Sequence, residues 1–422
     1  MEQRAMKLTA FGEKFGGRSG IGELMDDLGQ ALRENPDMIF MGGGNPARIP
    51  ELEHCFEQKL EALLQSPQSR HQLLGIYQSK QGEKAARQAL ASYLKRHFGW
   101  AVNEHHIAFA NGSQNACFIL YNLFAGQMAD GSQRTLHLPL VPEYLGYRDI
   151  GLSRDFFTAT KPTIELLEKQ QFKYHVDLNA LTVGEQCGAI SVSRPTNPTA
   201  NVLSDDEVDA LQALCKQRNI PLIVDGAYGL PFPNIVFGQA APRWDEQTIL
   251  MLSLSKLGLP GIRSGIVVAS EEVISAFNNA NSIVNLASST IGPALLTELL
   301  KNDQIDQLSR TIVQPFYRDR AAATMALLQA QLDGLPARIH KPEGAIFLWL
   351  WLDNLPIASY QLYQRLKARG VLVVPGEDFF IGVDSQWQHQ RQCLRLSYAA
   401  DPAVIARGVA IIGEEVHRAY AS

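Results

Sequence analysis

The sequence predicts an α/β protein with a large, mostly parallel sheet domain flanked by helices and a smaller α/β domain. Two observations lead to this prediction. Across residues 105–265, short apolar runs alternate with segments of helical periodicity, an order typical of parallel sheets with helices on both faces. Beyond residue 307, a long helical pattern leads into a second alternation of strands and helices. We therefore expect a large domain over residues 51–320 and a small domain made of residues 1–50 and 321–422.

The expected strands are mainly apolar runs that stop at glycine, proline or polar residues. In chain order they cover residues 38–41, 105–109, 135–141, 188–193, 220–224, 249–254, 345–352, 371–374 and 393–398. The run at 220–224 is almost wholly apolar, as in a strand that is buried on both faces.

The expected helices carry apolar residues at intervals of three and four. They cover residues 19–33, 81–100, 114–123, 204–218, 307–332, 359–369 and a C-terminal segment. Ser19 is the expected N-cap of the first helix. The last helix has one apolar face, made of Ile405, Val409, Ile412 and Val416.

Composition argues against several classes of partner. The chain of 422 residues has 38 Lys and Arg against 43 Asp and Glu, a net charge of -5 without a long charge run, so neither nucleic acid nor an anionic membrane is expected. Its five cysteines are far apart, form no CxxC pair and have no histidine at metal-ligand spacing, which predicts a cytoplasmic location and no metal. Residues 1–8 lack an apolar signal core, and the most apolar stretch, 345–352, is far shorter than the roughly 20 residues of a membrane span.

Residues 251–265 give the strongest indication of a functional site. An apolar strand ends in Ser253, Ser255 and Lys256, and a glycine-rich turn with Arg263 follows. A lysine acts as a nucleophile when its amine is fixed in place and uncharged, and ligands collect at the C-terminal ends of strands in α/β sheets. Hydroxyl groups, glycines and a guanidinium group together suit a phosphate. Taken alone, this segment leaves open a solvated lysine after a Ser-rich turn.

Other polar residues also follow predicted strands. Asn197 lies between two prolines that fix its loop. Asp225 ends the strand at 220–224 and Tyr228 follows; taken alone, Asp225 is better explained as a helix N-cap than as the partner of a cation. Ser113 and Gln114 stand between a strand and a helix, where backbone N–H groups point at an anion, although many α/β loops of this kind bind nothing.

Three further residues give weaker signals. Gly44 belongs to the glycine-rich segment 42–46, which permits a backbone close to a ligand but is equally well explained as a plain turn. Tyr144 follows the strand at 135–141 and could stack on a flat heterocycle, although packing is the commoner role. Tyr77, in a loop, fits a core, surface or ligand-contacting position.

Together these residues resemble the fold type I, pyridoxal-phosphate-dependent aminotransferases of class I and II, over essentially the whole chain. The match rests on the order of Asn197-Pro-Thr, Asp225 with Tyr228, the Ser-x-Ser-Lys block with Arg263, and Arg395. Asp225 follows Asn197 by 28 positions and Lys256 follows Asp225 by 31, and both spacings are typical of that family.

The resemblance implies pyridoxal 5'-phosphate as cofactor, bound to Lys256 as a Schiff base, with Asp225 paired to its pyridinium nitrogen. It implies that Asn197 and Tyr228 hydrogen-bond the phenolic oxygen of the ring and that Tyr144 stacks on the ring. The expected ligands of the phosphate are Ser113, Gln114, Ser253 and Arg263.

The substrate and the partner subunit follow from the same resemblance. Arg395 would hold the substrate α-carboxylate in a bidentate fork, beside Asn197 and the backbone of Gly44. Members of the family are usually homodimers in which a tyrosine of one subunit reaches the site of the other, and Tyr77 matches that tyrosine. One departure is visible, because the usual Asn-Pro-Thr-Gly ends here in Ala200. An alanine serves there if its φ is negative, so we interpret it as a subfamily difference.

The expected reaction is ping-pong transamination with Lys256 as general base. Four stretches, at 40–46, 192–198, 254–261 and 339–350, resemble most the branch of the family that transfers the amino group of L-valine to pyruvate. Residues 346–347 and 379–380 are either an apolar side-chain pocket or core.

Other activities remain open at this point. Aromatic or 2-aminoadipate-type substrates are the main alternative, and Arg48 is the candidate for a second carboxylate ligand. The fold also hosts lyases and decarboxylases. A regulatory protein with an aminotransferase-like domain usually adds a DNA-binding module, for which residues 1–50 are too few and not basic enough.

Overall fold

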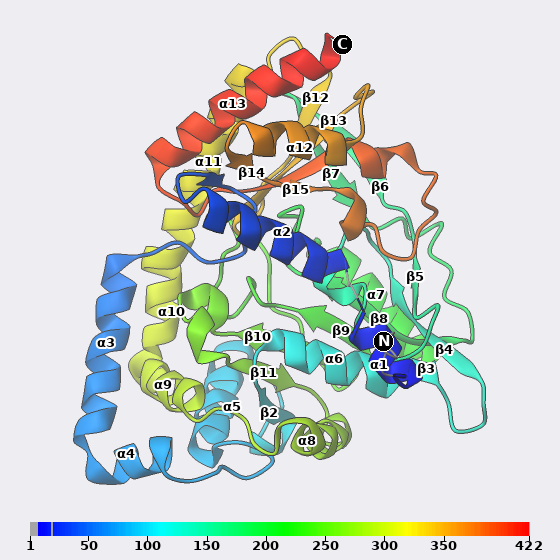
Figure 1. Ribbon diagram of the computed structural model, residues 1–422. Helices are drawn as coiled ribbons and strands as arrows, with labels where there is room; N and C mark the ends of the chain where they lie inside the picture. Colours follow the sequence, from blue (N-terminus) through cyan, green and yellow to red (C-terminus); the bar gives the residue numbers. More distant parts are fainter. Residues whose placement is uncertain (1–6, 18–19, 422) are drawn as a thin grey trace, which may run out of the picture.

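The computed structural model describes residues 7–17 and 20–421 (Figure 1). Its larger sheet has eight strands in the order β2-β11-β10-β9-β8-β4-β3, with β5 paired to β4. These strands are β2 (Ile107–Ala110), β3 (Gly126–Gln127), β4 (Gln133–Leu138), β5 (Phe157–Ala159), β8 (Cys187–Ser193), β9 (Leu222–Asp225), β10 (Thr248–Ser253) and β11 (Gly265–Val268).

The larger sheet is mostly parallel, as predicted. Strands β5, β4, β8, β9 and β10 pair in parallel, and β11 runs antiparallel to both β10 and β2. Asp225 lies opposite Ser193 on one side and Met251 on the other. The carboxyl ends of β8, β9 and β10 therefore meet at one edge of the sheet, which is where the sequence places its polar residues.

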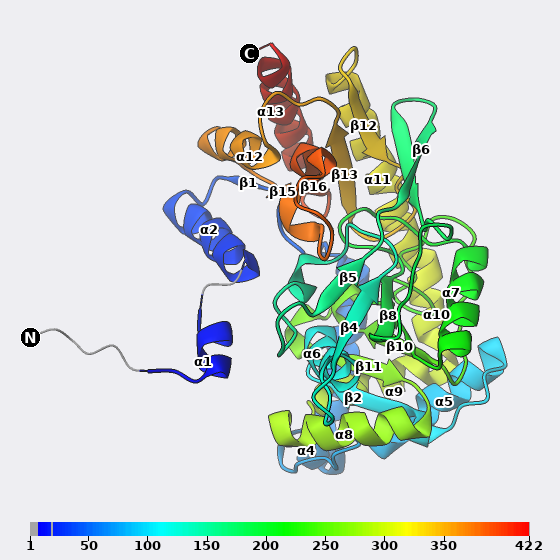
Figure 2. The same cartoon turned by 90° about the vertical axis from the view of Figure 1, so that its right-hand side faces the viewer.

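Helices lie on both sides of this sheet (Figure 2). For example, α6 packs on β10 and β11, while α7 packs on β9. A capping box begins α7, because Ser204 Oγ accepts from Glu207 N at 3.1 Å and the Glu207 carboxylate accepts from Ser204 N at 2.7 Å. The helices of this part are α3 (Pro50–Gln65), α4 (Pro67–Leu74), α5 (Lys84–Phe98), α6 (Ser113–Phe124), α7 (Asp205–Arg218), α8 (Glu271–Asn285) and α9 (Ile291–Leu300).

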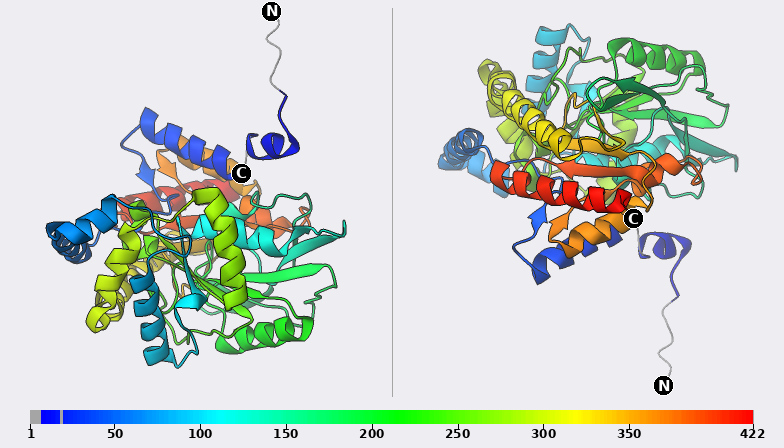
Figure 3. Two further views of the ribbon diagram at one scale, coloured as in Figure 1. Left: turned by 90° about the horizontal axis from the view of Figure 1, so that it is seen from below. Right: turned by 90° about the horizontal axis from the view of Figure 1, so that it is seen from above.

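A second, six-stranded sheet has the order β15-β16-β13-β12-β7-β6. Its strands are β6 (Thr163–Leu167), β7 (Gln171–His175), β12 (Ala337–His340), β13 (Phe347–Leu352), β15 (Val374–Pro375) and β16 (Cys393–Ser397). Helices α11 (Gln314–Gln331) and α13 (Pro402–Tyr420) run side by side near it, and α12 (Ser359–Ala368) lies nearby (Figure 3). Strand β1 (Ile39–Phe40) pairs in parallel with β14 (Val371–Leu372) and so brings an N-terminal segment to this second α/β part.

The structure departs from the sequence prediction at several points. Strands β6 and β7 fall within residues 51–320 but belong to the second sheet, since β7 pairs with β12. The long helix expected at 307–332 is divided into α10 (Gln304–Leu308), a π-helical turn (Ser309–Val313) and α11. Helix α2 (Gly20–Glu34) confirms the first predicted helix, but its expected cap, Ser19, lies outside the described residues.

The central strands of the larger sheet are enclosed on both faces. All residues of β8, β10 and β11 are buried, as expected for strands covered by helices on either side. None of the helices formed by residues 7–17 and 20–421 is long and apolar enough to span a bilayer.

Candidate active site

Lys256 lies at the end of the central strand. Strand β10 ends at Ser253, and the single 3-10 turn Ser255–Leu257 then directs Lys256 into a cavity. Its Nζ donates to the Gly44 carbonyl at 2.6 Å and lies 5.3 Å from the centroid of the Tyr228 ring. Burial, together with nearby guanidinium groups, lowers the pKa of Lys256 to about 8 although Asp225 opposes this shift. The lysine is therefore fixed and partly neutral at physiological pH, as a nucleophile requires.

Asp225, at the end of β9, faces the same cavity. The Tyr147 hydroxyl donates to its Oδ2, and Ala227 N donates to its Oδ1 at 2.9 Å. Burial raises the pKa of Asp225, while the bonds from Tyr147 and Ala227 and the charge of Lys256 act in the opposite direction. No helix starts at Asp225, so the side chain is a half-buried acceptor in the cavity and not a helix cap.

Asn197 and Arg395 meet although 198 positions separate them in the chain. Arg395 Nη1 donates to Asn197 Oδ1 and Nη2 donates to the Gly42 carbonyl, both at 2.8 Å. Its guanidinium carbon lies 4.3 Å from the ring centroid of Phe347 and 5.2 Å from that of Phe379. Burial lowers the pKa of Arg395 to about 10, so it keeps its charge at neutral pH. Its Nε is buried and has no hydrogen-bond partner among the described residues.

A second anion site lies at the N-terminus of α6. Gly112 precedes that helix with φ of +94°, and Ser113 and Gln114 form its first turn. A Cβ at Gly112 would lie 2.4 Å from Arg263 Nη2, so glycine is required for the guanidinium to approach the helix end. Backbone N–H groups, a helix dipole and a guanidinium group thus converge on one point, an arrangement suited to a phosphate.

The predicted residues surround one cavity of about 410 Å³. Gly44, Ser113, Gln114, Tyr144, Asn197, Asp225, Tyr228, Ser253, Lys256, Arg263 and Arg395 all line it. An aldehyde-bearing pyridine with a phosphate group fits this set of residues, since the cavity combines a lysine of lowered pKa, a half-buried carboxylate and a phosphate cradle.

Tyr77 is the predicted site residue that the structure does not bring to this cavity. It follows α4, and 83% of its surface is exposed. Phe347 and Phe379 are buried and flank Arg395, so they support the guanidinium group and do not line the cavity. Arg48 points outward and pairs with Glu53 at 2.7 Å, which leaves it away from the cavity.

Several residues of the site escaped the sequence prediction. Tyr147, Ser193 and Glu143 form a buried polar chain behind Asp225, in which Ser193 Oγ donates to Glu143 at 2.6 Å and lies 3.4 Å from Tyr147 Oη. Burial raises the pKa of Glu143 to about 8. Met25, which lines the cavity from α2, was also missed. The Glu-Tyr-x-x-Tyr pattern at 143–147 was a possible signal, because polar groups in a buried turn need partners.

Ala200 has φ of +62° and is fully buried. The negative φ that would let alanine replace the usual glycine without cost is therefore absent. A non-glycine residue in this left-handed region is strained by roughly 1–2 kcal/mol, so neighbouring contacts must hold the loop.

The fold and cavity define an α/β enzyme built around a cofactor-binding lysine at a strand end. The model of the family "Aminotransferase class I and II" matches residues 151–412. The chain belongs to this family, whose members use pyridoxal 5'-phosphate, and it adopts the fold type I architecture.

Known proteins resemble this chain over nearly its full length. The valine–pyruvate aminotransferase of Escherichia coli K12 is 49% identical over 416 residues, covering 99% of each chain. The crystal structure of valine-pyruvate aminotransferase from Salmonella typhimurium LT2 matches with a TM-score of 0.88 and 47% identity, covering 96% of this chain and 100% of that one. A putative amino-acid aminotransferase from Psychrobacter arcticum 273-4 matches with a TM-score of 0.96 and 44% identity, covering 99% and 100%.

Proposed function

We propose that this aminotransferase moves the amino group of L-valine to pyruvate, giving 3-methyl-2-oxobutanoate and L-alanine. The observation that carries the proposal is the full-length similarity to the E. coli enzyme of that name. The cavity lining supports it, because Met25, Leu28 and Leu145 offer apolar surface to a substrate side chain. An apolar pocket separates substrates that differ by one methylene by only about 1–3 kcal/mol, so alanine, 2-aminobutyrate and leucine should also react.

The residues around the cofactor have separate roles in this proposal. Bound pyridoxal phosphate supplies an electron sink for the amino acid's Cα. Lys256 would hold the cofactor and Asp225 would pair with its ring nitrogen, while the Tyr147 hydroxyl fixes the orientation of that carboxylate. Tyr144 would pack on the ring, and Asn197 and Tyr228 would donate to its phenolic oxygen. Ser113, Gln114, Ser253 and Arg263 would hold the phosphate.

Substrate binding places the reacting atoms beside Lys256. The guanidinium group of Arg395, already oriented by Asn197 and the Gly42 carbonyl, would bind the α-carboxylate through the Nη hydrogens that these two bonds leave free. Gly44 places its backbone next to Lys256 Nζ. The Lys256 amine would be the base that takes the Cα proton, and its lowered pKa suits it to this role near neutral pH.

We also propose a homodimer in the cytoplasm. Two neighbouring segments expose large apolar side chains, and Thr290 Oγ1, which donates to the Leu73 carbonyl at 2.6 Å, ties these segments together. The exposed side chains are Leu74, Ile76, Tyr77, Ile283, Val284 and Leu286. A second copy would cover this apolar surface and bring Tyr77 to the neighbouring cavity. All five cysteines are free, which suits a reducing compartment.

The two-domain division remains part of this proposal. Residues 51–320, apart from β6 and β7, would form the cofactor-binding domain, and residues 1–50 with 321–422 would form the small domain that supplies Arg395. The substrate would then bind between the two parts, because Asn197 follows β8 of the larger sheet and Arg395 belongs to β16 of the second sheet.

A substrate comparison tests the proposed activity. Initial rates with L-valine and pyruvate should give parallel double-reciprocal plots, the kinetic pattern of a ping-pong reaction. The value of kcat/KM for L-valine should exceed those for L-phenylalanine and L-2-aminoadipate. A preference for either of these two donors would replace the substrate while keeping the chemistry. DNA binding without transamination by the purified protein would instead indicate a regulatory protein.

A further inference from the structure

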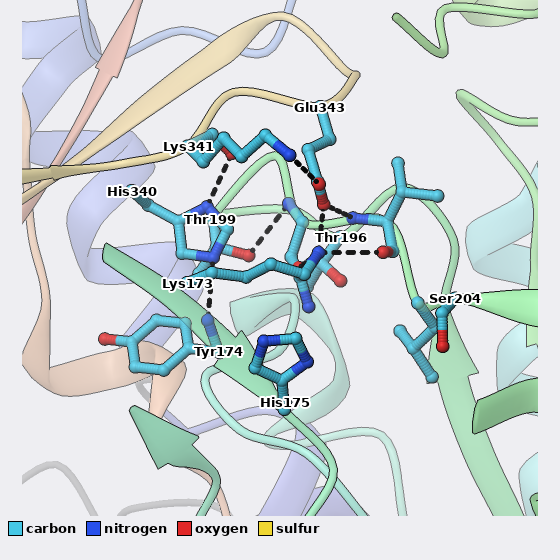
Figure 4. Close-up of polar contacts among 12 residues, drawn as sticks. Lys173, Tyr174, His175, Thr196, Thr199, Ser204, His340, Lys341 and Glu343 are labelled. Carbon is cyan, nitrogen blue, oxygen red and sulfur yellow. Dashed lines mark hydrogen bonds and ion pairs between the residues drawn. The ribbon is translucent and has the colours of Figure 1, made fainter. Parts of the chain in front are cut away.

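A buried ion pair lies behind the Asn197 loop. Lys173 of β7 and Glu343, in the turn between β12 and β13, form the pair, and their side chains are only 10% and 15% exposed (Figure 4). Burial raises the pKa of Glu343, but the charge of Lys173 and the hydrogen bonds outweigh this effect and leave it below its ordinary value. Glu343 is therefore ionised at neutral pH.

Lys173 and Glu343 form hydrogen bonds with three consecutive residues of the loop, 200–202. Lys173 Nζ donates to Asn201 Oδ1 at 2.9 Å and to the Val202 carbonyl at 3.1 Å. Glu343 Oε2 accepts from Val202 N at 3.1 Å, and its backbone N donates to the Ala200 carbonyl at 3.0 Å. Both members of the ion pair therefore bind residues 200–202.

A histidine fixes the two elements that carry the pair. Tyr174 N donates to His340 Nε2 at 3.1 Å, so the ring hydrogen is on Nδ1, which donates to the Lys341 carbonyl at 2.9 Å (Figure 4). Burial lowers the pKa of His340 to about 3, which keeps the ring neutral. The side chains of Lys173 and Glu343 therefore emerge from neighbouring, fixed backbone positions.

The loop that the ion pair binds also contains Asn197. Thr196 N donates to the Asn201 carbonyl at 2.8 Å, and Ala200 N donates to the Thr196 carbonyl at 2.9 Å, so residues 196–201 form a closed turn. Asn197 lies inside this turn and accepts from Arg395. The strained Ala200 is at the other end of the turn, directly against Glu343.

We propose that Lys173 and Glu343 are positioning residues that hold the strained turn and thereby place Asn197 against Arg395. This inference rests on the proposed role of Arg395 and Asn197 in binding the amino acid. Buried ion pairs add little stability, because desolvation offsets their attraction, and fixing a conformation is a use better suited to them. A glycine at position 200 would let the turn form with less external support.

The test uses a neutral pair, K173M/E343Q, which removes both charges while the amide introduced at position 343 keeps an acceptor for Val202 N. We expect KM for L-valine to rise about tenfold, equivalent to about 1.4 kcal/mol, with a smaller change in kcat. Hydrogen exchange of backbone amides 196–202 should quicken in the protein without cofactor. K341M is the matched control, because Lys341 contacts Glu343 from a half-exposed position without touching the loop, and it should behave as wild type.

A rescue variant separates positioning from general stability. Adding A200G to K173M/E343Q should bring KM for L-valine most of the way back to its wild-type value, since glycine adopts the positive φ without support from Lys173 and Glu343. E343D, which keeps the charge but withdraws it from the loop, should act in the same direction and serves if the neutral pair does not fold. The inference would be overturned if KM and the exchange of amides 196–202 both stay at their wild-type values, whether or not the melting temperature falls. Failure of the wild-type protein to transaminate L-valine would instead refute the proposed function. The hydrogen-exchange measurement would still test the positioning role, because it does not depend on that activity.

Discussion

Replacing Arg395 with lysine should reduce catalysis without removing the cofactor. The guanidinium group makes 2.8 Å bonds to Asn197 and Gly42 and stacks on Phe347. An ammonium group keeps the charge but cannot bond both the loop and a bidentate carboxylate. Loss of about two charge-assisted bonds at 1.5–3 kcal/mol each, partly compensated by the retained charge, leaves a deficit of about 3–4 kcal/mol. This corresponds to a fall of about 10²–10³-fold in kcat/KM.

The assay is the rate of the first half-reaction with L-valine at limiting substrate, followed by the change in cofactor absorbance. The dissociation constant of pyridoxal phosphate should stay close to that of the wild type, because Arg395 is not part of the phosphate cradle. R48K is the matched control, since Arg48 is exposed and lies outside the cavity. A kcat/KM for R395K within a few-fold of wild type would refute the assignment of Arg395 to the carboxylate.

Three other changes test the cofactor site. G112A should raise the dissociation constant of pyridoxal phosphate at least tenfold, or about 1.4 kcal/mol, because its Cβ would lie 2.4 Å from Arg263 Nη2 at a φ of +94°; unaltered binding in an absorbance titration would contradict the phosphate cradle. The rate at which cofactor-free protein captures pyridoxal phosphate should rise with pH and level off above about pH 8, because the lowered pKa of Lys256 frees its amine there; a rate that is flat across this range would show that Lys256 is not the capturing amine. Y147F should lower kcat about tenfold while the cofactor stays bound, since an orphaned buried acceptor on Asp225 costs about 1–3 kcal/mol, and a wild-type kcat would remove Tyr147 from the mechanism.

The larger sheet and most of the cavity could be predicted from the sequence because strand ends are local features. Ser193, Asp225 and Ser253 each terminate an apolar run, and parallel pairing brings such ends to one edge. Lys256 and Arg263 follow directly in the chain. The helical spacing of apolar residues likewise predicted α7 to within one residue and the presence of α13, although not its ends.

Contacts between distant segments could not be predicted in the same way. No local sequence pattern predicts that β7 pairs with β12, because the pairing of β7 depends on which sheet can bury Phe172 and Tyr174. The backbone angle of Ala200 could not be predicted for a related reason, since residue type favours a negative φ and the positive value depends on contacts with Thr196 and Glu343. Tyr77 needs a second copy of the chain, so its position relative to the cavity stays a prediction.

An absorbance spectrum of the purified protein with pyridoxal phosphate, recorded before and after L-valine and again after pyruvate, tests the central claim most directly. The account predicts a visible band that shifts to shorter wavelength with L-valine, with release of 3-methyl-2-oxobutanoate, and that returns when pyruvate is added. K256A should show no such band, because Lys256 is the amine that binds the cofactor in this account. The account would be contradicted if the wild-type band does not shift when L-valine is added, or if K256A still turns over at the wild-type rate.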